Sequence, residues 1–183
     1  MIQNVFRFGD SYWIQLSGTA MGAPPAPMYA TLYFAKIENQ FIPKYPNLFY
    51  YRRYIDDGFG IWNITAEENA VQNEKRWNDF KNNFNSVSTL EWTFSDRTRT
   101  TDFLDINVTL TDDGRVRTRI FEKALNLHLY LPPHSCHPPG VLKGIIHGMM
   151  LRFHRLSTTS AMAQNDVKQF LKRLVLRGYS PIV

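Results

Sequence analysis

Apolar and polar residues alternate with the two-residue period of a β-strand in several stretches of this sequence. Six of these stretches form three pairs joined by short turn sequences rich in glycine and aspartate, which is the pattern of a β-hairpin. In another stretch Leu90, Trp92 and Phe94 alternate with polar residues, which predicts a single half-buried strand. The predicted hairpins cover residues 5–16, 50–62 and 103–120.

Apolar residues with a helical period predict one helix on each side of the central hairpin. The first begins near Pro27, which suits a first helical residue, and ends before Pro43. The second follows residues 65–68, which have the sequence of a capping box. The apolar stripe of the first helix consists of Met28, Leu32, Ala35 and Ile42, and that of the second consists of Ala70, Val71, Trp77, Phe80 and Phe84.

Two further helices are predicted towards the C-terminal end, over residues 141–156 and 166–177. Asp166 is the expected N-cap of the second of these helices, and Gly178 is its expected stop. Prolines bracket an irregular piece before them, so we expect a subdomain boundary near residues 125–131. The expected inward residues are Ile145, Met149, Phe153 and Leu156 in one helix and Val167, Phe170, Leu171 and Leu174 in the other.

Together these elements predict an α+β fold, in which an antiparallel sheet with packed helices is followed by a helical segment. We place the two parts at residues 1–124 and 125–183. A chain of 183 residues with 44% hydrophobic and 14% aromatic residues can bury a core, which excludes an intrinsically disordered protein.

The overall charge bears on the class of partner, and the single cysteine bears on the compartment. A formal net charge of +5 favours a polyanionic partner, although plain solubility explains a small positive charge equally well. Cys136 is the only cysteine, which excludes an internal disulfide framework and fits a reducing, intracellular compartment. No apolar run approaches the length of a membrane span, and the first residues do not resemble a signal peptide, so we expect no membrane partner.

Asp56 and Asp57 are adjacent at the expected tip of the central hairpin. Two neighbouring carboxylates repel one another unless a cation lies between them, and hard oxygen ligands of this kind suit Mg²⁺, or Mn²⁺ in its place. The pair therefore predicts half of a two-metal phosphoryl-transfer site. A solvated Asp-Asp-Gly turn is the alternative for the pair taken alone.

Basic residues gather in the last predicted hairpin and in the two C-terminal helices. In the return strand Arg115, Arg117 and Arg119 share one face, which makes a basic stripe. A charged, solubilising edge strand and a phosphate-binding surface both account for this stripe. On the helices Lys143, Arg152 and Arg155 are the candidate nucleic-acid contacts.

A cluster of histidines around Cys136 raises the alternative of zinc binding. His134, Cys136 and His137 are separated by one residue and by none, and only His128 is nearby. Such short spacings do not easily wrap one tetrahedral ion, so a packed turn is the preferred interpretation.

Several short sequence words, in one order along the chain, resemble those of reverse transcriptases. Residues 54–57 read Tyr-Ile-Asp-Asp, and residues 15–22 read Gln-Leu-Ser-Gly-Thr-Ala-Met-Gly. Further words include Ala-Pro at residues 26–27 and Phe-Leu-Asp at residues 103–105. Together with Tyr130, Leu131, Ser135, His137, Pro138, Gly144 and Arg152, these words most resemble the reverse transcriptases of Penelope-like retroelements.

The resemblance implies a partial palm subdomain followed by the start of a thumb, from an RNA-directed DNA polymerase that transfers nucleotides with Mg²⁺ or Mn²⁺. Its expected partners are an RNA template, a DNA primer and a deoxynucleoside triphosphate. Asp56 and Asp57 would be the catalytic metal ligands, and the hairpin of residues 103–120 would grip the primer strand. The residues expected near template or nucleotide are Gln15, Gly18, Met21, Gly22, Ala23 and Tyr54.

This chain departs from the reverse transcriptase pattern at its start. The family's first catalytic aspartate lies on a strand ahead of the Gln-x-x-Gly loop, and the chain begins too late to contain it, since Asp10 lies in a turn. We therefore expect no useful polymerisation by this chain alone. An unpaired sheet edge would also invite self-association.

Two other functional classes stay open. One is a non-catalytic nucleic-acid-binding or assembly protein derived from such a polymerase, and the other is a truncated fragment without a selected function. The missing aspartate is the feature that separates them from an active enzyme.

Overall fold

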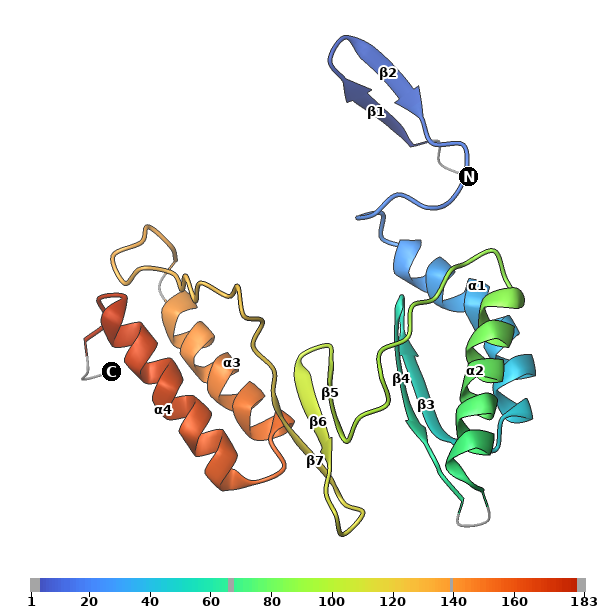
Figure 1. Cartoon of the computed structure of the whole chain (residues 1–183). Coiled ribbons are helices and arrows are strands. Elements are labelled where there is room, and N and C mark those ends of the chain that lie inside the picture. The colour runs from blue at the N-terminus through green and yellow to red at the C-terminus, as the bar shows by residue number, and fades with distance from the viewer. Residues whose placement is uncertain (1–3, 66–67, 139, 181–183) are drawn as a thin grey trace. The chain divides into compact units, whose positions relative to one another are not determined.

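The computed structural model describes residues 4–65, 68–138 and 140–180. The chain divides into two compact units, Met1–Asp96 and Arg97–Val183, each with helices and antiparallel strands (Figure 1). The predicted α+β class is therefore confirmed, while nothing in the fold establishes a reverse transcriptase palm.

The first unit contains two separate two-stranded hairpins and two long helices. Its core is a cluster of the buried rings of Phe34, Phe41, Phe80 and Phe84, with the helices lying against one face of the central hairpin (Figure 1). The elements are β1 (Val5–Phe8), β2 (Ser11–Ile14), α1 (Ala26–Phe41), the 3-10 turn η1 (Ile42–Lys44), β3 (Leu48–Tyr54), β4 (Asp57–Trp62) and α2 (Ala70–Ser86).

The buried side of helix α1 agrees only in part with the predicted one, since Ile42 packs against the phenylalanine cluster but two other predicted residues do not. Met28 and Leu32 are 67% and 61% exposed, whereas Phe34 and Phe41 are the buried residues. The helix is apolar on more than one side, so its period alone does not select the buried face; the two phenylalanines do so because they meet the rings of α2. Ala26 is the first helical residue, one before the predicted Pro27.

Helix α2 begins later than predicted. Its N-cap is Asn69, whose side chain accepts a hydrogen bond from the backbone N–H of Gln72 while the Gln72 side chain accepts one from the Asn69 N–H. This capping box replaces the predicted one at residues 65–68, of which residues 66 and 67 lie outside the described part of the chain.

The segment predicted as a single strand is extended but is not paired as a strand. The Asn85 side chain takes the place of a neighbouring strand: its amide donates to the Trp92 carbonyl at 3.0 Å, and its oxygen accepts from the Trp92 N–H at 2.7 Å. Trp92 and Phe94 still pack on the phenylalanine cluster, whereas Leu90 is 41% exposed. The predicted alternation is therefore confirmed for two of its three residues, and the predicted strand is wrong.

The second unit packs two helices against a three-stranded antiparallel sheet of order β5-β6-β7. The hairpin predicted over residues 103–120 is present, but Phe103 ends β5, and a tight turn with Leu104 at φ +52° separates it from β6. The elements are β5 (Thr100–Phe103), β6 (Ile106–Leu110), β7 (Val116–Ile120), α3 (Val141–Leu156) and α4 (Ser160–Leu176).

Helices α3 and α4 lie side by side and run in opposite directions, joined by residues 157–159 (Figure 1). Phe153, Phe170 and Leu174 are buried against Ile120 of β7, as the predicted apolar faces require. Two predicted inward residues differ: Ile146 replaces Ile145 in this cluster, and Leu171 is 40% exposed.

Helix α4 begins earlier than predicted. Thr159 is its N-cap and accepts a hydrogen bond from the Met162 N–H, so Asp166 lies within the helix. Gly178 ends the helix as predicted, with φ at +99°, a conformation that glycine adopts without strain.

The boundary between the two compact units lies between Asp96 and Arg97, which is earlier in the sequence than the predicted division between residues 124 and 125. The hairpin of β6 and β7 groups with the helices because Ile120 and the Thr118–Thr158 hydrogen bonds join β7 to them. Whether residues 1–124 and 125–183 act as separate functional parts stays a prediction. Among the described residues, no helix is both long enough and apolar enough to cross a membrane.

We predict that the two units lose stability independently. Phe170→Ala removes a fully buried ring and should cost the second unit roughly 3–5 kcal/mol. All four tryptophans lie in residues 1–96, so tryptophan fluorescence reports on the first unit alone. The denaturant midpoint of the fluorescence transition should therefore stay unchanged in this variant. The part of the far-ultraviolet circular dichroism transition that comes from the second unit should move to lower denaturant.

Phe80→Ala serves as the mirror variant and should shift the fluorescence transition instead. Leu176→Ala, at an 88% exposed position, is the neutral control. A fluorescence transition that moves equally with Phe170→Ala would contradict independent units.

Candidate nucleic-acid interface

The acidic pair lies at the tip of the β3–β4 hairpin, as the sequence predicts. Tyr54 pairs with Asp57, so Ile55 and Asp56 form the two-residue turn. Ile55 has φ of +53°, an uncommon conformation for a β-branched residue. Asp56, Asp57 and Tyr54 are all exposed.

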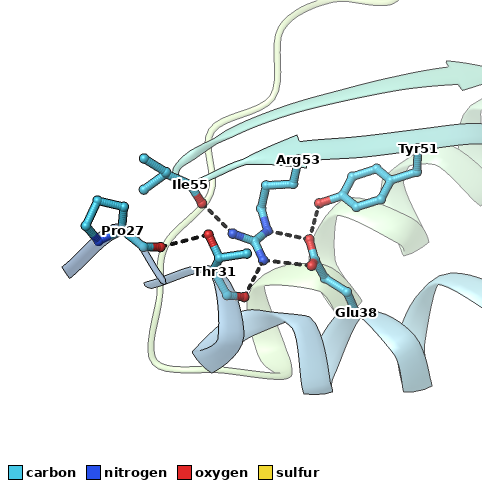
Figure 2. Close-up of polar contacts among 6 residues, drawn as sticks. All are labelled: Pro27, Thr31, Glu38, Tyr51, Arg53 and Ile55. Carbon is cyan, nitrogen blue, oxygen red and sulfur yellow. Dashed lines mark hydrogen bonds and ion pairs between the residues drawn. The ribbon is translucent and has the colours of Figure 1, made fainter. Parts of the chain in front are cut away.

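A buried ion pair holds this hairpin to α1 (Figure 2). The Arg53 guanidinium donates to both Glu38 carboxylate oxygens, at 2.6 and 2.8 Å, and the two side chains are only 4% and 12% exposed. The same guanidinium donates to the backbone carbonyls of Ile55 and Thr31. One arginine thus joins the strained turn to the helix, which fixes the turn's conformation.

Tyr51 completes this network by donating its hydroxyl to Glu38 at 2.6 Å. Burial of the phenol, together with its hydrogen bond to the Glu38 carboxylate, raises the pKa of Tyr51 well above its ordinary value. The hydroxyl therefore stays protonated and acts as a donor. The network therefore joins the hairpin to α1 through the single carboxylate of Glu38.

Of the residues predicted to lie near template or nucleotide, Tyr54 ends β3, and the other five are in the loop between β2 and α1. The Gln15 side chain donates to the Ser17 carbonyl at 2.9 Å, and the Ala23 N–H donates to the Ala20 carbonyl. Gly18 and Gly22 have φ of +77° and +89°, and Met21 is fully exposed. These contacts are internal to the loop, so its role at a template stays a prediction.

The metal predictions have no support from side-chain clustering. Within the described ranges, no three His, Cys, Asp or Glu side chains gather closely enough to hold a metal ion. This statement covers Asp56 and Asp57 as well as the His134–Cys136–His137 piece, where Ser135 and His137 form a hydrogen bond of 2.5 Å. Binding of Mg²⁺ or Mn²⁺ at the acidic pair stays a prediction.

The arginine stripe on β7 lies where the alternation predicts. Ile120 is buried against the helices and Thr118 bonds to Thr158, so Arg117 and Arg119 point to the opposite face of the sheet and are exposed. Arg115 is also exposed and pairs with Asp113 at 3.5 Å.

Some basic side chains of α3 and α4 are engaged in internal contacts. Arg152 pairs with Asp105 at 2.8 Å. Arg173 forms a two-point contact with Glu122 at 2.6 and 2.8 Å, which lowers the pKa of that carboxyl. Arg177 donates to the Tyr130 carbonyl. Arg173 and Arg177 thus anchor the segment between β7 and α3, and Arg152 contacts the turn between β5 and β6. The exposed basic residues within the two helices include Lys143, Arg155, Lys168 and Lys172.

The outer side of α4 also carries amide side chains that the sequence prediction left out. Ala163, Phe170 and Leu174 face the core, which places Gln164, Asn165 and Gln169 among the exposed residues. Gln169 lies inside the predicted helix of residues 166–177 but is not among the predicted contacts, whereas Gln164 and Asn165 precede the start of that predicted helix. Extending the apolar period back from Val167 to Ala163 would have found them.

Charge is divided unevenly between the two units. The first unit has 8 basic and 10 acidic residues, whereas the second has 13 basic and 6 acidic residues. Within residues 129–182 there are seven lysines and arginines and one acid, Asp166. Burial raises the pKa of the Asp166 carboxyl, which favours its neutral form. The formal net charge is therefore −2 in the first unit and +7 in the second, so the excess positive charge belongs to the second unit.

Comparison with protein families gives a match to the animal helix-turn-helix domain over residues 129–182. This range contains α3, the connection of residues 157–159 and α4. No curated protein and no solved structure matches the chain.

The family comparison overturns the resemblance to a Penelope-like reverse transcriptase. No reverse transcriptase family matches, and the segment assigned to a thumb matches the helix-turn-helix domain instead. The words that carried the resemblance lie mainly in turns and loops, such as residues 54–57 and 15–22, where tight turns favour Asp and Gly for conformational reasons.

We predict that breaking the Glu38–Arg53 pair destabilises the first unit. Glu38→Gln leaves a buried guanidinium without its counter-charge, which should cost roughly 3–5 kcal/mol. Denaturation followed by tryptophan fluorescence measures the change. Glu91→Gln, at an exposed position of the same unit, is the control, and equal stability of the two variants would refute the prediction.

We also predict weak binding of Mn²⁺ or Mg²⁺ to the acidic turn. Paramagnetic broadening of amide signals by Mn²⁺ should be strongest around residues 54–58 and should disappear in Asp56→Asn/Asp57→Asn. Asp112→Asn/Asp113→Asn, which changes the other exposed Asp-Asp-Gly turn, is the matched control. Identical broadening in the wild-type chain and the first variant would show that the turn holds no ion.

Proposed function

We propose that the second unit is a non-catalytic nucleic-acid-binding module that contacts double-stranded DNA through α4. The observation that carries the proposal is the match of residues 129–182 to a helix-turn-helix domain, in a segment with seven basic residues and one acid. Such a domain places its second helix in the major groove. In this chain the second helix is α4.

The side chains at the start of α4 are suited to base contacts. In helix-turn-helix proteins the N-terminal residues of the second helix reach the base edges. Gln164, Asn165 and Lys168 are exposed there. Asparagine and glutamine pair with adenine through two hydrogen bonds, and lysine suits the acceptors of guanine. The chemistry of this surface therefore supports duplex DNA as the partner.

Phosphate contacts come from the other exposed basic residues of the helix pair. Lys143, Arg155 and Lys172 are exposed, and contacts of this kind position a duplex without reading its sequence. Arg117 and Arg119 point away from the helices, so the strand stripe forms a second and separate basic surface. The two surfaces can therefore be tested separately.

We predict that Lys168→Glu/Lys172→Glu weakens duplex binding at least tenfold. Two phosphate or base contacts are lost, and the slope of log affinity against log salt should become shallower by about one to two units. Fluorescence anisotropy with a labelled duplex of about 20 base pairs, over a series of salt concentrations, measures both effects. Lys75→Glu, on α2 of the first unit, is the matched control and should change little.

The strand surface is tested with Arg115→Glu/Arg117→Glu/Arg119→Glu in the same assay. If α4 is the contacting element, the helix variant should lose more affinity than this triple variant. An affinity that is insensitive to salt and to both sets of substitutions would refute nucleic-acid binding by this unit.

A further inference from the structure

Helices α3 and α4 leave an open groove on the surface of the second unit. Its volume is about 830 Å³, and Ile146 and Met150 of α3 line it together with Leu171 and Val175 of α4. The described lining is mainly apolar. The groove borders the core that joins the helices to β7, since Ile146, Leu174 and Tyr179 belong to both, whereas the fully buried Phe153 and Phe170 do not line it.

The apolar side chains along this groove are only partly covered. Leu171 is 40% exposed, Val175 48% and Leu176 88%. A helix pair with one apolar side buried on a sheet and another open to solvent has an unfilled packing surface. Hydrophobic area of this kind gains free energy when another apolar surface covers it.

Lysines supply the charge of the groove. Lys168 and Lys172 are both exposed and both line it, while none of the residues described as lining it is acidic. An occupant therefore has to combine apolar groups with negative charge. A second copy of the same helix pair would bring lysines against lysines, and a nucleic-acid backbone has no apolar surface for the floor of the groove.

The extent of the groove fits a helix. On α4 its lining runs from Asn165 to Leu176. At about 1.5 Å of rise per residue this stretch is roughly 18 Å long, which is the length of three helical turns. Amphipathic helices bind between two helices with apolar residues at positions i, i+3, i+4 and i+7.

We propose that the groove between α3 and α4 binds an amphipathic helix of a partner protein, with apolar residues on the inward side and acidic residues beside them. Lys168 and Lys172 would pair with the acidic residues. Because the same lysines belong to the proposed DNA surface, the partner helix would compete with DNA. This competition rests on the proposed function, whereas binding of the helix in the groove does not.

The test uses the whole chain and three designed 18-residue peptides. The first has leucine at helical spacing flanked by glutamate, the second has lysine in place of glutamate, and the third is a scrambled version of the first. Labelled-peptide anisotropy should give micromolar binding for the first peptide and at least tenfold weaker binding for the other two. Equal binding of all three peptides would overturn the proposal.

Protein variants locate the binding surface. Leu171→Glu/Val175→Glu should abolish binding of the acidic peptide, while Leu125→Glu, at a 92% exposed position outside the groove lining, should not affect it. Because both groove residues are partly exposed, the variants should remain folded, which circular dichroism would check. Unchanged peptide affinity in the double variant, or self-association of the wild-type chain that this variant abolishes, would overturn the proposal.

A final arm separates the groove from the proposed function. If the wild-type chain binds the duplex, adding the acidic peptide should raise the apparent Kd for DNA in proportion to peptide occupancy. Peptide binding without any binding of DNA would support the groove and refute the proposed function. Simultaneous binding of both would overturn the competition.

Discussion

The packing of Phe153 and Phe170 against Ile120 is the contact on which the second unit depends. It joins two helices to the edge strand β7, and Thr158, in the connection between the helices, bonds to Thr118 of that strand. Because this side of the helix pair is buried, the polar side of α4 faces outward. The amide and lysine side chains of that helix are thereby presented on a fixed surface, and the inferred groove lies beside them.

The two units differ in what their surfaces carry. In the first unit, the buried Glu38–Arg53 pair and the aromatic cluster hold the β3–β4 hairpin against two helices. Its formal charge is slightly negative, whereas the second unit combines excess positive charge with a helix pair. The proposed DNA partner would therefore be attracted electrostatically to the second unit rather than to the first.

The sequence predicted the elements more reliably than their limits or their role. The hairpins were found because alternating stretches flank short turns that contain aspartate. The apolar residues of α3 were mostly found because Phe153 dominates its buried side. The start of α4 was wrong, because Asp166 is a favoured N-cap residue whereas Thr159 performs the capping. Because of that error, Gln164 and Asn165 were not assigned to the outer surface of the helix. The reverse transcriptase interpretation was wrong because it joined short turn sequences into one motif. The basic residues noted in the two C-terminal helices, in contrast, lie in the segment that matches the helix-turn-helix domain.

Hydrogen exchange of the whole chain, with and without a DNA duplex of about 20 base pairs at low salt, tests the account most directly. If α4 contacts DNA, amides in residues 160–177 should exchange more slowly in the complex, and amides in residues 48–62 should exchange at an unchanged rate. Protection confined to the β3–β4 hairpin, or no protection anywhere at saturating DNA, would contradict the assignment of nucleic-acid binding to the helix pair.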